Sequence, residues 1–154
     1  MAPGEVAVPQ TGVQRWQPPT VGPVGDKVPQ PLTFDQLEQL DEVIIEAERF
    51  TGLRFAIYLG DLGSDTRVGA EAIHAGLWPD GPMAVLLALS PGQRVVEIVT
   101  GYESAQRISD RAARLAVLSV VASCGDGDLM GALVNGIRTL ADQAGSIPPS
   151  PTWW

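Results

Sequence analysis

Two apolar segments near the middle of the chain constrain its fold more than any other feature. Residues 83–89 read Met-Ala-Val-Leu-Leu-Ala-Leu, and after the turn Ser-Pro-Gly-Gln comes Arg-Val-Val-Glu-Ile-Val-Thr over residues 94–100. A strand without polar residues is covered on both faces, so residues 83–89 belong in the centre of a sheet. The short turn favours antiparallel pairing of the two segments. Such a pair requires helices on both faces of the sheet.

Helical patterns surround these strands. Thr33 and Gln36 have the spacing of a capping box, and Ser109 and Asp128 are suited to cap two later helices. The order of elements predicts an α/β fold, a three-layer sandwich with a small mixed β-sheet and helices on both faces. The expected elements are a helix over 33–52, a strand over 53–59, a helix over 66–77, strands over 83–89 and 94–100, and helices over 109–125 and 128–143.

The third long helix carries apolar residues at helical spacing. Ala112, Leu115, Leu118 and Val121 recur every three or four residues, which is typical of the buried face of an amphipathic helix. We expect these four side chains to face the core.

The composition divides the chain into three parts. Seven of the thirteen prolines lie in residues 1–32, where proline and glycine disfavour regular structure. We expect a flexible tail over 1–32, one α/β domain over 33–144 and a second flexible tail over 145–154. An alternative for the first tail is an extended segment whose Trp16 docks on the domain or on a partner.

Charge and length exclude several classes of function. Ten basic and eighteen acidic residues give a net charge of −8, which repels nucleic acid. No apolar run approaches the roughly 20 residues needed to cross a bilayer, so we expect no membrane insertion, while peripheral association with a membrane complex stays open. The opening lacks the pattern of an export signal, which predicts a cytoplasmic protein. The one cysteine, Cys124, can form no intramolecular disulfide.

Acidic residues lie in several of the expected loops. If these loops meet at one end of the sheet, the carboxylates could hold Ca²⁺ or Mg²⁺, which prefer oxygen ligands, and a bound metal could position water for hydrolysis of a phosphate ester. The alternative is structural, because aspartates also cap helices and stabilise turns. The candidate metal ligands are Asp80, Glu103, Asp110, Asp126 and Asp128.

A second group of residues indicates a protein partner. Arg107, Arg111 and Arg114 recur at spacings of four and three, which makes one basic stripe on an acidic chain. The stripe could pair with acids of the same chain or a neighbouring subunit, or receive an acidic partner or a phosphate. Exposed tryptophans are common in protein interfaces. The candidate aromatic anchors are Trp16, Trp78, Trp153 and Trp154.

Several short motifs resemble those of the TPM domain, the family of thylakoid-lumen, photosystem-repair and receptor-modulator proteins. They are the strand 83–89, the segment Arg94–Thr100 with Gly101-Tyr102, then Ile108-Ser109-Asp110, and later Gly127-Asp128-Leu129. The resemblance covers about residues 34–143 and suggests an uncharacterised actinobacterial branch. It implies a three-layer α/β domain, with calcium binding and weak phosphatase activity in some relatives and roles in membrane-complex assembly in others. This chain departs from the pattern at Pro82-Met83 and at Glu103.

The sequence therefore favours a non-enzymatic module that binds another protein, in the assembly or regulation of a larger complex. A weak Ca²⁺- or Mg²⁺-dependent phosphatase that uses the acidic loops is the alternative.

Overall fold

The two apolar segments form neighbouring antiparallel strands, as predicted. In the computed structural model, which describes residues 12–13 and 32–148, β3 (Ala84–Ser90) pairs with β4 (Val95–Thr100). Every residue of β3 is buried. The parallel strand β2 (Arg54–Leu59) lies on the other side of β3, and the two-residue strand β1 (Gly12–Val13) completes the order β1-β2-β3-β4.

Strand β1 lies where no regular structure is expected from the sequence. Gly12 and Val13 pair in parallel with Ala56 and Ile57 of β2. This pairing lies within the expected flexible tail over 1–32. It has no signal in the side-chain pattern, because pairing to a free strand edge uses backbone groups. Leu32, at the end of that tail, is buried in the core. Residues 1–11, 14–31 and 149–154, with Trp16, Trp153 and Trp154, lie outside the described residues.

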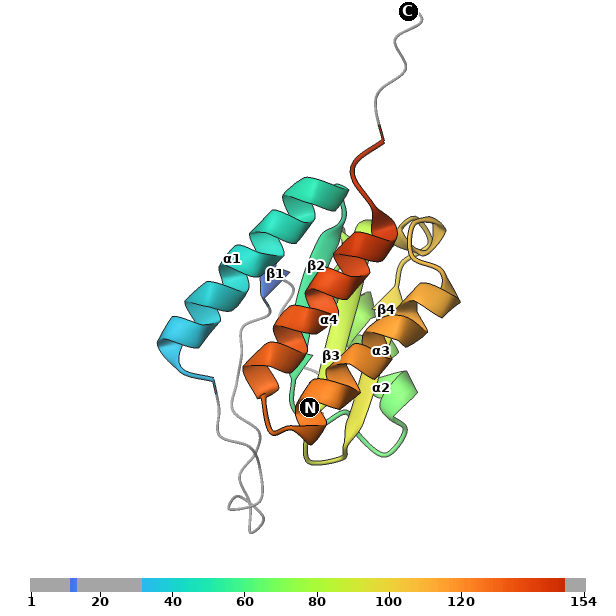
Figure 1. Ribbon diagram of the computed structural model, residues 1–154. Helices are drawn as coiled ribbons and strands as arrows, with labels where there is room; N and C mark the ends of the chain where they lie inside the picture. The colour runs from blue at the N-terminus through green and yellow to red at the C-terminus, as the bar shows by residue number, and fades with distance from the viewer. Residues whose placement is uncertain (1–11, 14–31, 149–154) are drawn as a thin grey trace, which may run out of the picture.

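Helices cover both faces of the sheet, which confirms the three-layer α/β sandwich. In the described part of the chain, α1 (Phe34–Thr51), α3 (Asp110–Gly125) and α4 (Leu129–Ala144) pack on one face and α2 (Thr66–Ala75) packs on the other (Figure 1). Two short 3₁₀ helices, η3 (Gly81–Met83) and η4 (Ser104–Gln106), lie before β3 and after β4. None of the described helices is long and apolar enough to cross a membrane.

Alternation along the strands sends side chains to two cores. Phe55 of β2 and Leu87 of β3 belong to the larger core under α1, α3 and α4. Tyr58 and Leu86 belong to the smaller core under α2, where they meet Ile73. The three-layer arrangement follows from this alternation, because each face of the sheet presents apolar side chains that must be buried.

The helix starts follow the capping signals in the sequence. The Thr33 hydroxyl accepts from the Gln36 N–H at 3.1 Å, and the Gln36 side chain accepts from the Thr33 N–H at 2.9 Å. Ser109 and Asp128 cap α3 and α4 in the same manner. These predicted caps are confirmed, and each saves an N–H group at a helix start from being left unbonded.

Helix α3 turns a different face to the core from the one predicted. Ala112 is buried as predicted, but Leu115, Leu118 and Val121 are 45%, 65% and 52% exposed, and Ala116 and Val120 are buried in their place. The reason is the close approach of α4, since a Cβ atom on Gly136 would lie 2.7 Å from the Val120 Cγ2 atom. Only the smaller of the two apolar sides of α3 fits against a neighbour that near.

Candidate functional site

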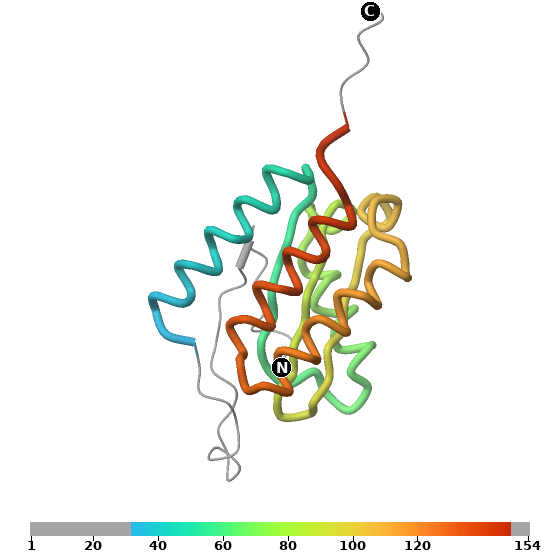
Figure 2. The backbone as a smooth tube through the Cα atoms, in the orientation of Figure 1, coloured from blue at the N-terminus to red at the C-terminus, as the bar shows by residue number. Residues whose placement is uncertain are grey.

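The five candidate metal ligands lie at opposite ends of the sheet. The Glu103 N–H donates to the Pro82 carbonyl at 2.9 Å, so Glu103 lies near Asp80, and Asp110 opens α3 at the same end. Asp126 and Asp128 follow α3, whose 16 residues span about 24 Å. Figure 2 shows the chain running back along the sheet through α3 between the two loops.

The predicted convergence of these carboxylates is therefore wrong. Convergence requires the loops before and after α3 to lie at one end of the sheet. Because α3 runs the length of a strand, these two loops lie at opposite ends. Over residues 12–13 and 32–148, no group of three or more His, Cys, Asp or Glu side chains is placed to hold a metal ion. Asp128 instead caps α4, with its Oδ1 atom accepting from the Gly131 N–H at 2.8 Å.

Arg107, predicted to bind a partner, is directed into its own fold. Its guanidinium donates to the carbonyl oxygens of Thr51 at 2.9 Å, Ala144 at 3.2 and 3.3 Å, Gly145 at 2.9 Å and Ser146 at 3.1 Å. Thr51 ends α1 and Ala144 ends α4, so one cation lies at two helix C-termini, where positive charge is favourable. Arg107 thus joins α1 and α4, and the predicted basic stripe is reduced to Arg111 and Arg114.

Arg111 and Arg114 stand on the exposed side of α3 and make no ion pair or side-chain hydrogen bond with any described residue. They share that side with the apolar residues that were expected in the core. We call this side the outer face of α3, and all its residues are exposed: Arg111, Arg114, Leu115, Leu118, Val121, Ala122 and Gly125.

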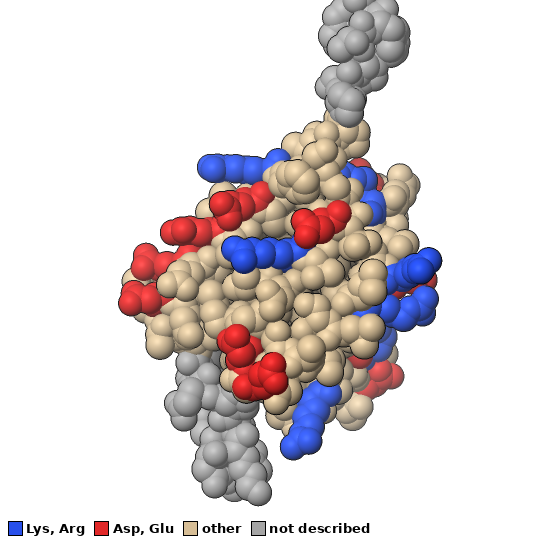
Figure 3. Space-filling view, viewed as in Figure 1, with Lys and Arg blue, Asp and Glu red and all other residues tan. Residues whose placement is uncertain are grey.

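The surface of α1 is acidic, whereas much of the surface over α3 and α4 is uncharged. Figure 3 shows acidic side chains along α1 at the left of the view and broad uncharged areas over α3 and α4. A helix with apolar residues on both sides is typical of an element covered on both sides. The sequence signal for this surface is the second apolar stripe of α3. Its helical spacing shows that the stripe lies on one side of the helix, but not whether the core or a partner covers that side.

An apolar groove borders the outer face of α3. It has a volume of about 750 Å³ and lies between the end of α3, the turn after β3 and the first residues of β4. Val96, Val121, Cys124 and Leu129 line it. Burial, and secondarily the charge of Asp128, raises the pKa of the Cys124 thiol, so the thiol is neutral at physiological pH and is no activated nucleophile.

At the other end of the sheet, Trp78 is 74% exposed. Tyr102, which the sequence interpretation did not select, is 72% exposed. The segment that follows Trp78 meets the turn that holds Tyr102, because a Cβ atom on Gly101 would lie 2.1 Å from the Gly81 carbonyl oxygen. This end therefore carries two exposed aromatic rings on adjoining loops.

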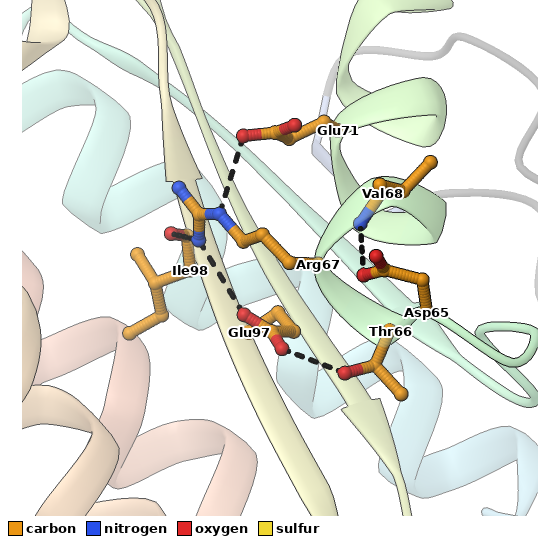
Figure 4. Close-up of polar contacts among 7 residues, drawn as sticks. All are labelled: Asp65, Thr66, Arg67, Val68, Glu71, Glu97 and Ile98. Carbon is orange, nitrogen blue, oxygen red and sulfur yellow. Dashed lines mark hydrogen bonds and ion pairs between the residues drawn. The ribbon is translucent and has the colours of Figure 1, made fainter.

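Strand β4 is the last strand of the sheet, and a side chain of α2 covers part of its open edge. The Gly101 N–H donates to the Ala84 carbonyl, so alternation along β4 directs the backbone groups of Ile98 away from β3. The Arg67 guanidinium donates to the Ile98 carbonyl at 2.7 Å and contacts the Glu97 carboxylate at 3.5 Å (Figure 4). The Thr66 hydroxyl donates a hydrogen bond to the other carboxylate oxygen of Glu97 at 2.8 Å.

One partly buried carboxyl, that of Glu48, lies between α1 and β2. The Glu48 Oε2 atom accepts from the Phe55 N–H at 3.0 Å, and its other oxygen lies 3.6 Å from Arg54. Burial raises the pKa of the Glu48 carboxyl above its ordinary value, and the Phe55 hydrogen bond and Arg54 offset this only in part. Glu48 therefore has a structural role in fixing the start of β2.

The chain is similar to a family of unknown function and to two uncharacterised bacterial proteins. Residues 20–141 match the model of a domain of unknown function, DUF5130. Two uncharacterised proteins of Mycobacterium tuberculosis, MT2543 of strain CDC 1551 and Rv2468c of strain H37Rv, are each 39% identical over 118 residues, which cover 77% of this chain and 69% of theirs.

Solved structures share the architecture at low identity. BA42 from the psychrophilic bacterium Bizionia argentinensis matches with a TM-score of 0.67 at 17% identity, covering 77% of this chain and 85% of BA42. The N-terminal domain of cg2496 from Corynebacterium glutamicum matches with a TM-score of 0.60 at 12% identity, covering 77% and 81%. At such identities the likeness shows the fold alone.

These findings correct the resemblance to the TPM domain. Its motifs are short, and in the structure they form β3, β4 with the turn after it, and the starts of α3 and α4. The family model that matches is a different one and spans most of the chain, so the TPM identification and its actinobacterial branch are wrong. The chain belongs to the DUF5130 family.

Proposed function

We propose that this DUF5130 protein is a non-enzymatic module that binds another protein chain through the outer face of α3. The single observation that carries the proposal is the exposure of Leu115, Leu118 and Val121 on one side of a helix whose other side is buried. Water contact with three neighbouring apolar side chains is unfavourable, and their burial against a partner would gain about 25 cal/mol for each Å² removed from water.

The surroundings of these residues suit a partner. Arg111 and Arg114 lie beside the apolar residues without an ion pair among the described residues, so a partner's carboxylates have two donors to meet. The groove next to Val121 offers a recess for an apolar side chain. A helix laid along α3 would use both features, since side chains at helical spacing can follow the stripe.

A hydrolytic role receives no such support. The alternative phosphatase requires carboxylates that converge on one metal ion, and α3 separates them by its own length. A cytoplasmic location is part of the proposal, and with one cysteine the chain has no intramolecular disulfide to lose in a reducing compartment.

Site-specific photo-crosslinking in cells tests the proposal. A photoreactive amino acid replaces Leu118, and in a control chain it replaces Glu42 on the exposed side of α1. We expect crosslinked products from position 118 and not from position 42, and fewer of them when Arg111→Glu and Arg114→Glu are added. Equal products from both positions, or none from position 118, would contradict the proposal.

A further inference from the structure

We propose that the occupant of the outer face of α3 is the same face of a second copy, with the two helices antiparallel across a twofold axis near Leu118. This inference rests on the proposed function and names its partner. An isologous contact requires a surface that complements itself when reversed, and the charges, the spacing and the free space along α3 meet that requirement.

The two ends of α3 differ in net charge. In its first turns the exposed Arg111 and Arg114 outnumber Asp110, whereas Asp126 and Asp128 are exposed just beyond its last turn. When one copy is reversed on the other, each pair of arginines lies beside the partner copy's pair of aspartates. The arginines then also lie near the C-terminus of the partner helix, where a cation is stabilised.

The spacing of the exposed residues is also compatible with reversal. The positions of the outer face are symmetric about Leu118, because Leu115 and Val121 lie three residues from it, Arg114 and Ala122 four, and Arg111 and Gly125 seven. A reversed copy then places apolar residues against apolar residues in the middle. Alternation of three and four is the spacing that keeps two helices in contact along a shared seam.

Gly125 leaves room for the arginine of the partner copy. Reversal about Leu118 brings Arg111 of one copy opposite Gly125 of the other, and a Cβ atom on Gly125 would meet nothing within 4 Å. The long arginine side chain can therefore cross the partner helix and reach Asp126. A larger residue at position 125 would block that path.

Other ways of self-association are less favourable. Pairing through β4 is obstructed by Arg67 at the Ile98 carbonyl. Contact of α3 with the acidic side of α1 of another copy would join two different surfaces and give a ring or an open chain of molecules instead of a closed pair. The net charge of −8 opposes association in general, but salt screens charges beyond about 8 Å, so the local pairs at the ends of α3 dominate.

Analytical ultracentrifugation of the full chain tests the pairing. We expect the mass to rise with concentration from 16.3 kDa toward twice that value. Leu118→Asp should weaken dimerisation about 30-fold or more, because it places a charge at the centre of the apolar contact. Arg138→Glu, on the exposed side of α4, is the matched control and should dimerise like the parent chain.

A charge exchange distinguishes self-pairing from general stickiness. Arg111→Glu/Arg114→Glu and Asp126→Arg should each be monomeric, because each places like charges together at both ends of the pair. An equimolar mixture of the two variants should recover the dimer, since both ends are then complementary. Circular dichroism spectra like that of the parent would show that both variants fold.

Three outcomes would overturn the pairing: a parent chain that stays monomeric at every concentration, a dimer that Leu118→Asp leaves intact, or a mixture that stays monomeric. The crosslinking experiment separates this failure from failure of the proposed function. Crosslinks from position 118 to a different protein, with a monomeric chain, would refute the pairing and retain the binding module. No crosslink at all would refute both.

Discussion

Replacement of Arg107 by alanine should destabilise the protein strongly although the side chain is partly exposed. The guanidinium makes five hydrogen bonds to carbonyl oxygens, of which those to Thr51 and Gly145 are the shortest at 2.9 Å. These carbonyls end α1 and α4 and have no helical N–H to bond. Without Arg107, the carbonyl of the buried Thr51 loses its charged donor.

The magnitude follows from the two short contacts. A hydrogen bond with a charged partner contributes about 1.5–3 kcal/mol, and solvent competition at a partly exposed group favours the lower end of that range. Arg107→Ala should therefore reduce the free energy of unfolding by about 3 kcal/mol. For a folded region of this size, that loss lowers the melting temperature by about 10 °C. Arg107→Lys keeps the charge but not the planar fork and should lose about half as much.

Urea denaturation followed by far-ultraviolet circular dichroism measures this loss. Arg138→Ala is the control, because Arg138 is exposed on α4, lies outside the outer face of α3 and makes no ion pair or side-chain hydrogen bond with any described residue; it should change the free energy of unfolding by less than about 0.5 kcal/mol. If the alanine variants at positions 107 and 138 unfold at the same urea concentration, the argument that Arg107 joins the two helix ends is refuted.

Three further substitutions test other parts of the structure. Glu48→Gln should gain stability relative to the parent as the pH rises from about 4 to about 7, because the raised pKa of Glu48 means that the parent loses stability as this carboxyl ionises above its ordinary pKa. Gly69→Ala should cost about 1–3 kcal/mol in a thermal melt, since its Cβ atom would lie 1.9 Å from the Leu62 carbonyl oxygen. Arg67→Ala should change the melting temperature little but speed aggregation, measured by light scattering, because it uncovers the Ile98 carbonyl.

Each of these substitutions has a control at a site without the feature tested. Glu46→Gln on the exposed side of α1 should show no change of relative stability over the same pH interval. Gly92→Ala should be tolerated, because a Cβ atom there meets nothing within 4 Å. Arg138→Ala should aggregate at the parent rate. A control that behaves like its test variant would contradict the corresponding argument.

Local signals in the sequence account for most of the fold. The capping box of Thr33 and Gln36 and the uninterrupted apolar run of β3 each act over a few residues, so one sequence suffices to interpret them. Helix α2 contains Gly69, and the lack of a side chain there allows the helix to approach the Leu62 carbonyl. It ends at Ala75, two residues earlier than expected.

The candidate site was harder to predict because it depends on which elements are neighbours in space. Periodicity in α3 marks two apolar sides, and only the approach of Gly136 on α4 decides that the side with Ala116 is buried. The spacing of Arg107 and Arg111 predicts a shared helix face, yet Arg107 precedes the helix and reaches two distant carbonyls. Sequence spacing cannot show contacts of this kind.

The order of Arg67 and β4 along the chain has a consequence for synthesis. A ribosome releases α2 before it releases β4, so the guanidinium that occupies the Ile98 carbonyl is already outside when that strand emerges. The exposed row of amides on a nascent strand is most hazardous on a polysome, where identical chains are crowded together. In this protein the protective residue precedes the strand that needs it, and the Ile98 carbonyl is covered as soon as α2 packs against the hairpin.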